Sequence, residues 1–197
     1  MALVCGIVLG AGSSRRLGRP KQTLPFGDTT LLGWVVRDVE ASSLDRVVVV
    51  VGPVAEGFVP RRAEVTSNTS YATGCASSLL AGLDAVGDCD AVMLLLGDMP
   101  GVDAAIIDAV RADWERHRPW AAVTDYQGAP GHPFVFSAEA FTTLRGLHGD
   151  KAVWKIVDAQ PERVRRIPVD RPLPADVDTW DDYEAACAAL GFSAPVR

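Results

Sequence analysis

The chain has 197 residues, the size of one ordinary domain, and 48% of them are apolar while 22% are charged. Such a composition can bury a sizeable core, which excludes disorder over most of the chain. The 19 Lys and Arg residues are outnumbered by 25 Asp and Glu residues, giving a formal net charge of -6. This acidic balance argues against a protein that holds nucleic acid by displacing counterions from phosphates. Any phosphate ligand must be held by a local basic site.

The first residues, MALVCGIVLGAG, are apolar but lack a basic start, and three arginines follow before about 20 apolar residues have passed. We therefore expect neither a signal peptide nor a membrane-spanning segment, and no membrane partner. The four cysteines are widely spaced, with no C-x-x-C pair. They are typical of small buried side chains in a reducing compartment, so we expect a cytoplasmic protein.

Short β-branched runs alternate with longer amphipathic stretches, without repeats or low-complexity tracts. This alternation is typical of an α/β, Rossmann-like fold with a mainly parallel sheet and helices on both faces, here in one domain over residues 1–197. The predicted elements are strand 3–9, helix 30–41, strands 46–51 and 63–67, helix 75–86, strand 91–96, helix 104–116, strands 121–125 and 133–136, helices 138–147 and 151–158, strand 164–168 and helix 180–190. Residues 169–176, with two prolines, are predicted to cross the surface as a linker.

A basic loop with glycines follows the first predicted strand. In open sheets of this class ligands bind beyond the carboxyl ends of the strands. Gly10 and Gly12 allow a tight turn that presents backbone N–H groups to an anion. The cationic side chains of this loop are Arg15, Arg16, Arg19 and Lys21. The loop therefore predicts a polyphosphate cradle, without the G-K-[ST] of a Walker A loop or the third glycine of a dinucleotide fingerprint; the alternative is a turn with a solvated basic face.

An aspartate follows the predicted strand 91–96, in the segment LLLGDMPGV. Asp98 comes directly after a fully apolar run and before a turn with proline, at the same edge of the sheet as the basic loop. A carboxylate there is a suitable ligand for a hard cation such as Mg²⁺. The alternative is a turn aspartate that caps the helix beginning near Asp103.

A polar segment at residues 67–78, SNTSYATGCASS, precedes an apolar helix. The backbone at Gly74 could approach a ligand closely, and the side chains of Asn68, Ser77 and Ser78 could hydrogen-bond a base or a ribose. Capping of the helix by Thr73 or Ser77 is an alternative that is compatible with ligand binding.

Four aspartates crowd the start of the last predicted helix, at positions 176, 178, 181 and 182. The helix dipole favours negative charge there, so capping explains some of them. Four carboxylates exceed what a cap requires. We expect Asp178 to be a second metal ligand opposite Asp98.

Weaker candidates concern the acceptor side of the predicted site. His132, in APGHPF, could contact a substrate, although a histidine in such a loop is often satisfied locally. Asp150 and Lys151, in GDKAVWKIV, could line the acceptor side or belong to an amphipathic helix. No Ser/His/Asp or Cys/His arrangement has supporting local context, which argues against catalysis through a nucleophilic side chain.

Together these segments resemble the MobA-like NTP transferases, and within them most closely the molybdenum cofactor cytidylyltransferases. The family opens with L-A-A-G-x-S-x-R-M-G-x-P-K-x-L-L-P, and residues 9–25 read LGAGSSRRLGRPKQTLP. The matches are Gly12, Ser14, Arg16, Gly18, Pro20 and Lys21, and the departures are Gly10 and Leu17. Later family motifs follow in order at residues 74–79, 97–100, 131–133 and 176–183, so the resemblance covers almost the whole chain.

The resemblance implies a nucleotide-diphospho-sugar transferase-like fold and nucleotidyl transfer, in which an acceptor phosphate attacks the α-phosphorus of a nucleotide and pyrophosphate leaves. It implies catalytic roles for Arg16, Lys21 and Asp98, and binding of Mg²⁺ or Mn²⁺ by Asp98 and Asp178. The nucleotide-binding residues that it implies are Leu9, Gly10, Ala11, Gly12, Ser13, Ser14, Arg16, Lys21, Asn68, Gly74, Ser77 and Ser78.

The resemblance also bears on the substrates. Ala11 and the RPK at 19–21 stand where the guanylyltransferases usually have a glycine and a G-x-D-K ending, which favours CTP over GTP. The implied acceptor is the phosphate of molybdopterin, a phosphorylated pterin, with a molybdoenzyme as a further partner. At 149–154 the chain reads GDKAVW where relatives usually read G-D-x-G-A-R. The alternatives are a guanylyltransferase, a sugar-phosphate nucleotidyltransferase of the same fold, and a non-catalytic nucleotide-binding chaperone that inserts a cofactor.

Overall fold

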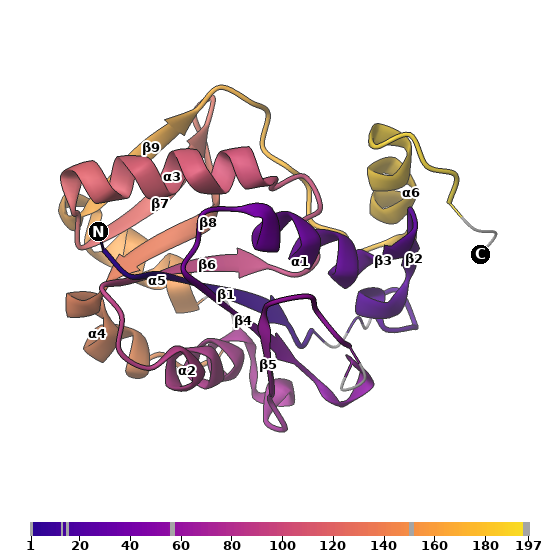
Figure 1. Ribbon diagram of the computed structural model, residues 1–197, viewed down its shortest axis with the longest axis horizontal. Helices are drawn as coiled ribbons and strands as arrows, with labels where there is room; N and C mark the ends of the chain where they lie inside the picture. Colours follow the sequence, from indigo (N-terminus) through magenta and orange to yellow (C-terminus); the bar gives the residue numbers. More distant parts are fainter. Residues whose placement is uncertain (1, 13, 15, 56–57, 150–151, 195–197) are drawn as a thin grey trace.

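The computed structural model describes residues 2–12, 14, 16–55, 58–149 and 152–194. A seven-stranded sheet runs through it in the order β5-β4-β1-β6-β8-β7-β9 (Figure 1). Its strands are β1 (Val4–Gly10), β4 (Arg46–Val51), β5 (Glu64–Ser67), β6 (Ala91–Leu96), β7 (Ala121–Tyr126), β8 (Ala129–Ser137) and β9 (Val164–Val169). Strands β5, β4, β1 and β6 are parallel, β8 is antiparallel to β6 and β7, and β9 is parallel to β7. The sheet is mainly parallel, as predicted.

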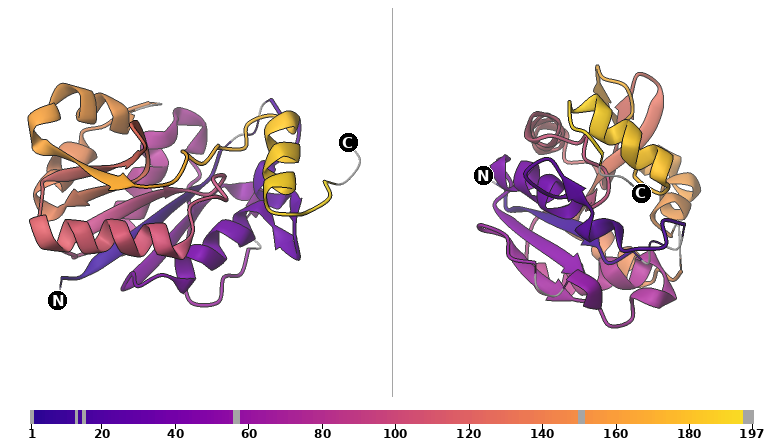
Figure 2. Two further views of the ribbon diagram at one scale, coloured as in Figure 1. Left: turned by 90° about the horizontal axis from the view of Figure 1, so that it is seen from above. Right: turned by 90° about the vertical axis from the view of Figure 1, so that its right-hand side faces the viewer.

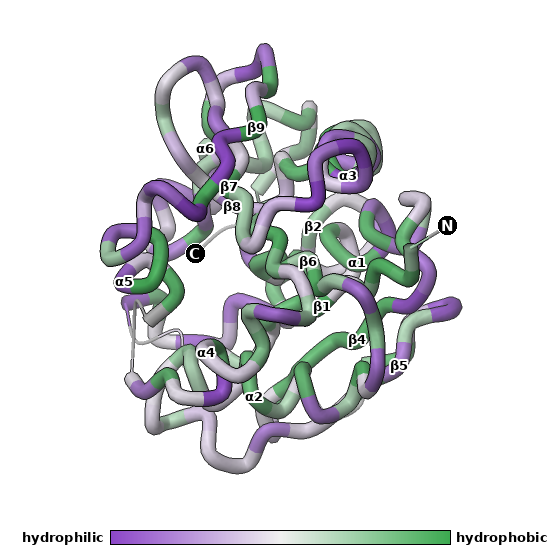
Figure 3. Tube along the Cα trace, turned by 90° about the vertical axis from the view of Figure 1, so that its left-hand side faces the viewer, coloured by the Kyte–Doolittle hydropathy of each residue, from purple (hydrophilic) through white to green (hydrophobic). Residues whose placement is uncertain are grey.

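Helices cover both faces of this sheet. They are α1 (Leu31–Ala41), α2 (Cys75–Val86), α3 (Ala104–His117), α4 (Phe141–Arg145), α5 (Ala152–Ala159) and α6 (Trp180–Ala189). Helices α1 and α3 contribute to the apolar cluster on one face, and α2, α4 and α5 to the cluster on the other. The central strands β1, β4 and β6 consist largely of apolar residues (Figure 3). In β4, alternate valines enter opposite clusters, which is why the run shows no polar alternation.

The predicted and observed elements differ in a few places. A short hairpin of β2 (Pro25–Phe26) and β3 (Thr29–Thr30) was not predicted, and β8 begins earlier than the predicted strand 133–136. The predicted helix 138–147 is a 3-10 turn followed by the short α4. The 3-10 helices are η1 (Lys21–Thr23), η2 (Pro53–Ala55), η3 (Tyr71–Thr73), η4 (Ala138–Ala140) and η5 (Pro161–Arg163).

A third apolar cluster joins distant parts of the chain. Phe26, in the hairpin, packs with Val177 and with Tyr183 of α6, and all three side chains are almost fully buried. The Tyr183 hydroxyl donates a hydrogen bond to the carbonyl oxygen of Pro25. Helix α6 consequently stands beside the β2–β3 hairpin and away from the sheet (Figure 2). Within the described residues, the helices lack the combination of length and apolar character that a membrane span requires.

Candidate active site

A cavity of about 530 Å³ opens beyond the carboxyl ends of β1 and β6, where the sequence predicts ligand binding. The predicted site residues on its wall are Leu9, Ala11, Gly12, Ser14, Arg16, Lys21, Gly74, Ser78, Asp98 and Asp178. Lining residues that sequence reasoning missed are Gln22, Tyr71, Ala72, Cys75, Leu96 and Gly97. Gln22, Cys75 and Gly97 directly adjoin a predicted site residue in the chain, and that adjacency was the available signal.

The loop after β6 approaches the end of β1 closely at Gly97. Its backbone N–H donates to the carbonyl oxygen of Leu9 over 2.9 Å. A Cβ atom at this position would lie 2.8 Å from Cδ1 of Leu32 and 3.0 Å from the Leu9 carbonyl oxygen. Only glycine allows this approach, which sets the basic loop beside Asp98.

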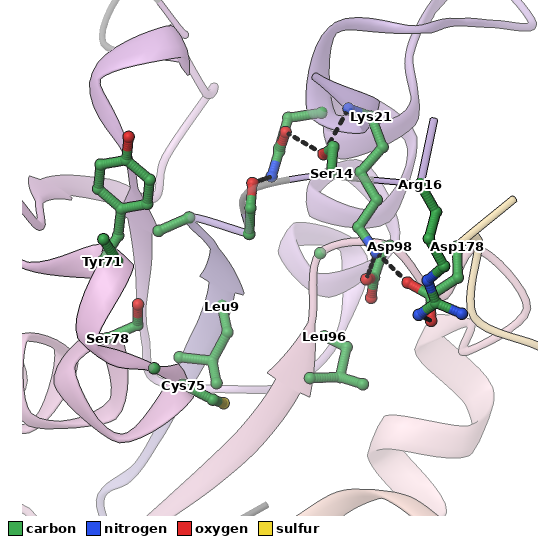
Figure 4. A pocket seen from close by; sticks show the side chains of 16 residues that line it. Leu9, Ser14, Arg16, Lys21, Tyr71, Cys75, Ser78, Leu96, Asp98 and Asp178 are labelled. Atoms are coloured by element: carbon green, nitrogen blue, oxygen red, sulfur yellow. Dashed lines mark hydrogen bonds and ion pairs between the residues drawn. The ribbon is translucent and has the colours of Figure 1, made fainter. Parts of the chain in front are cut away.

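Lys21 places a buried ammonium between two carboxylates (Figure 4). Its side chain is 9% exposed, and Nζ forms ion pairs with Asp98 and, at 2.8 Å, with Oδ1 of Asp178. The same Nζ donates to the carbonyl oxygen of Val177 over 2.9 Å. These three partners match the three N–H groups of a lysine ammonium.

The electrostatics of this group follow from burial and pairing. Burial alone would lower the pKa of Lys21, but the carboxylates of Asp98 and Asp178 outweigh it and raise that pKa, so the lysine is charged. Burial raises the pKa of Asp98, and the Lys21 ammonium offsets only part of the rise. At Asp178 burial is the largest single cause and acts to raise the pKa. The interactions with Lys21 and Arg16 together outweigh it and lower the pKa.

The C-terminal segment delivers Asp178 to the site. The backbone N–H of Val177 donates to the carbonyl oxygen of Asp98 over 2.9 Å, and the exposed Arg16 forms an ion pair with Asp178. Asp182 has a different task, because its carboxylate and the Thr179 hydroxyl form the capping box of α6. Asp182 therefore belongs to the cap and Asp178 to the site, and the segment predicted to be a surface linker leads directly into that site.

The capping alternatives are resolved by the observed N-caps. Asp103 is the N-cap of α3, and its side chain accepts from the backbone N–H of Ile106. Asp98 therefore does not cap that helix. Gly74 is the N-cap of α2, so neither Thr73 nor Ser77 occupies that position.

The two carboxylates also fit a divalent cation. Oδ1 of Asp98 is buried and, among the described residues, has no hydrogen-bond partner. The part of the chain that the structure describes has no group of three or more His, Cys, Asp and Glu side chains suited to a metal. Mg²⁺ is commonly held by one or two carboxylates together with substrate phosphates and water. Asp98 and Asp178 are thus a suitable pair for an ion that arrives with a phosphorylated ligand.

A small network shapes the basic loop. The backbone N–H of Lys21 donates to Oγ of Ser14 over 2.9 Å, and Nε2 of Gln22 donates to the carbonyl oxygen of Gly12 over 2.8 Å. These bonds tie the glycine turn to η1. Gly10 packs against α1 and β4, since a Cβ there would lie 3.1 Å from Leu32 and 3.2 Å from the Val50 carbonyl oxygen.

The polar segment before α2 is organised around Asn68, which is 5% exposed. Its Nδ2 donates to Oγ of Ser77 over 2.9 Å and to Oγ of Ser78 over 3.0 Å, while its Oδ1 accepts from the backbone N–H of Ser70. Gly74 and Ser78 line the cavity. Among the described residues, Asn68 and Ser77 belong to the network that supports this wall and are not part of its lining.

The candidate residues on the acceptor side are only partly described. The acceptor-side candidates Asp150 and Lys151 lie outside the described residues, as does Ser13, a nucleotide-binding candidate in the basic loop. His132 lies in β8, where Nδ1 donates to the carbonyl oxygen of Leu94 over 3.2 Å and the ring packs edge-on against Phe134. Burial lowers the pKa of His132 to about 4, so its ring is neutral at pH 7. Its contacts are local, and it is not among the described lining residues.

Comparison with solved structures finds close likenesses over nearly the full chain. A Mycobacterium tuberculosis Rv0371c homologue from Mycobacterium sp. strain JC1 is 39% identical, with a TM-score of 0.86 and coverage of 95% of this chain and 96% of the other. Rv0371c from Mycobacterium tuberculosis H37Rv, in a complex with manganese, is 33% identical, with a TM-score of 0.79 and coverage of 94% and 98%.

Curated relatives have more distant sequences. The molybdenum cofactor cytidylyltransferase of Escherichia coli (strain K12) is 29% identical, over 94% of this chain and 96% of the relative. The nicotine blue oxidoreductase of Paenarthrobacter nicotinovorans is 28% identical, over 89% and 92%. Residues 6–164 match the model of the MobA-like NTP transferase domain. The chain therefore belongs to the MobA-like NTP transferase family, as its motifs predicted.

Proposed function

We propose that this chain transfers CMP from CTP to the phosphate of molybdopterin and releases pyrophosphate, with Mg²⁺ or Mn²⁺. The observation that carries the proposal is the contact of Lys21 with Asp98 and Asp178 at one end of the cavity, beside the glycine turn. This end combines cationic donors for a triphosphate with two hard oxygen ligands for a divalent ion. The manganese complex of Rv0371c supports the choice of metal.

In the proposed reaction a bond forms between an acceptor phosphate oxygen and the α-phosphorus of CTP, and the bond from that phosphorus to the oxygen of the leaving pyrophosphate breaks. Lys21 and Arg16 would stabilise the charge that grows on the pyrophosphate, and backbone N–H groups of the glycine turn would hold the phosphates. A divalent ion bound by Asp98 and Asp178 would act as a Lewis acid toward the phosphate oxygens. The protein contributes position and charge and needs no nucleophilic side chain.

Two observations favour CTP and the pterin acceptor. Ala11, which lines the cavity, and the RPK sequence at 19–21 follow the pattern of the cytidylyltransferases. The cytidylyltransferase of Escherichia coli aligns with the chain over nearly its full length. A molybdoenzyme would be the partner that receives the product.

The first experiment measures pyrophosphate release with Mg²⁺ or Mn²⁺ and each of CTP, GTP, ATP and UTP, with and without molybdopterin. We expect release with CTP that requires the acceptor. Preference for GTP would indicate a guanylyltransferase, and release with a sugar phosphate in place of the pterin would indicate another acceptor class. Nucleotide binding without release for any acceptor would indicate a non-catalytic carrier.

Variants connect the reaction to the site. Lys21→Ala and Asp98→Ala should each lower the turnover at least about 100-fold, because each removes charge from the reacting phosphates. Asp88→Ala removes an exposed aspartate that does not line the cavity and is the matched control. Folded Lys21→Ala and Asp98→Ala proteins with full turnover would contradict the proposed roles.

A further inference from the structure

One aromatic side chain is set apart from the others. The chain has five Trp, three Tyr and six Phe residues, and every one of them lies in the described part. All except Tyr71 belong to one of the three apolar clusters or pack against one. Tyr71 lines the cavity of the site.

The position of Tyr71 in the cavity separates it from the charged groups. Its ring is half-buried and lies on the wall formed by η3 and the start of α2, while Lys21, Asp98 and Asp178 lie on the other side (Figure 4). On its own wall the neighbouring lining residues are uncharged: Ala72, Gly74, Cys75 and Ser78. The cavity thus has a charged end and an end with an aromatic ring.

The turn that carries Tyr71 is held in place by hydrogen bonds. The backbone N–H of Gly74 donates to the carbonyl oxygen of Tyr71 over 3.3 Å. The preceding residue, Ser70, donates its backbone N–H to the buried Asn68, which also binds the hydroxyl groups of Ser77 and Ser78. The backbone that carries the ring is therefore already ordered, so this turn costs little extra entropy when a ligand binds.

We propose that Tyr71 stacks on the nucleobase of the bound nucleotide. This inference rests on the proposed function in one respect, namely that the cavity binds a nucleoside triphosphate. With the phosphates at Lys21 and Arg16, the base must extend toward the uncharged wall, where Tyr71 offers an aromatic face. Stacking of a base on an aromatic ring tolerates any base, because every base has a π-face. Tyr71 therefore contributes affinity, and the choice of base is made elsewhere.

The test is calorimetric titration of the full chain, with Mg²⁺, against CTP, GTP and inorganic tripolyphosphate, which has no base. Tyr71→Ala should weaken CTP binding about tenfold, which corresponds to about 1.4 kcal/mol. GTP should lose at least as much, because a purine offers a larger ring. Tripolyphosphate binding should not change. Tyr71→Phe should bind all three ligands like the wild type, whereas Tyr71→Leu should behave like Tyr71→Ala.

Each outcome has one meaning. Equal losses for CTP and tripolyphosphate would show that Tyr71 only supports the turn, and would overturn the proposal. Unchanged nucleotide binding in a folded Tyr71→Ala protein would also overturn it, including the case in which the KM of the pterin acceptor rises instead. A wild-type chain that binds no nucleotide would contradict the proposed function itself, and a chain that binds nucleotide without transferring it would leave the stacking role intact.

Discussion

At the scale of single residues, Lys21 brings three interactions to one nitrogen atom. Its ammonium is buried and satisfied by two carboxylates and a backbone carbonyl group. Removing one partner of a buried ionic group leaves charge without compensation, which usually costs more than the pair itself contributes. Lys21 thus stabilises the ligand-free site, in addition to its role in the proposed reaction.

Replacing this lysine with methionine tests that dual role. Lys21→Met keeps the length of the side chain but leaves Asp98 and Asp178 without the cation between them. We expect the free energy of unfolding at pH 7, measured with urea, to fall by about 3 kcal/mol, and added Mn²⁺ to recover part of the loss. Arg61→Met, at an exposed arginine outside the cavity, is the control. Unchanged stability, with no response to Mn²⁺, would contradict this account.

His132 makes a pH-dependent contribution to stability. Its folded pKa of about 4 lies below the ordinary value of 6.5 because of burial. Between these two values the unfolded state binds more protons than the folded state, so the contribution is complete above about pH 6.5 and is lost as the pH falls toward 4. The full difference corresponds to at most about 3 kcal/mol.

The variant His132→Gln keeps a donor for the carbonyl group of Leu94 but removes the titration. We expect its unfolding free energy to decrease less than that of the wild type between pH 6.5 and pH 4.5. Taking the difference between the two proteins cancels the titration of the carboxyl groups, which both proteins share. Parallel pH profiles for the two proteins would show that His132 does not titrate as described.

Among the elements, the loop after β6 is placed by its close approach to the end of β1. At Gly97 a methyl group would meet the backbone of Leu9 as well as the Leu32 side chain, and backbone atoms cannot move aside easily. Gly97→Ala should therefore cost about 1 to 3 kcal/mol in the free energy of unfolding and lower the transfer activity.

Gly52→Ala is the matched control for that prediction. Gly52 is also buried beside the basic loop, but the nearest atom to its added Cβ, the carbonyl oxygen of Ala11, would be 3.6 Å away. The free energy of unfolding of the Gly52→Ala protein should stay within about 1 kcal/mol of the wild-type value. Equal effects of the two substitutions in denaturation would rule out the close approach as the cause.

The elements also mark how far the sequence alone could lead. The central strands were predictable because unbroken apolar runs are typical of strands buried on both faces. The convergence of Lys21 and Asp98 followed from their positions after parallel strands. The β2–β3 hairpin was not predictable, because two-residue strands are too short to show alternation. Side-chain direction was equally inaccessible: Asn68 was expected to touch the nucleotide, but its hydrogen bonds are to the neighbouring serines.

In the molecule as a whole, the third apolar cluster fastens the C-terminal segment to the loop after β1. Tyr183→Ala should open a cavity in this cluster, whose described members lie outside the strands of the seven-stranded sheet. We expect faster amide hydrogen exchange in residues 17–31 and in α6, weaker Mn²⁺ binding, and little change in the central strands. Phe134→Ala, in the apolar cluster between the sheet and helices α2, α4 and α5, should instead accelerate exchange in the strands. Uniform acceleration in Tyr183→Ala would show that the C-terminal segment does not open separately.

The separation of Lys21 and Asp178 along the chain has a consequence for biosynthesis. The two residues are 157 positions apart, and their side chains meet in the finished protein. At ordinary translation rates the ribosome needs about 8 to 30 s to make the intervening segment. Until Asp98 is made Lys21 lacks both carboxylates, and afterwards it still lacks Asp178. Throughout that time the surface that will receive α6 is uncovered. A nascent chain therefore has the glycine turn before it has both carboxylates, and the charged end of the cavity is complete only after the C-terminal segment leaves the ribosome.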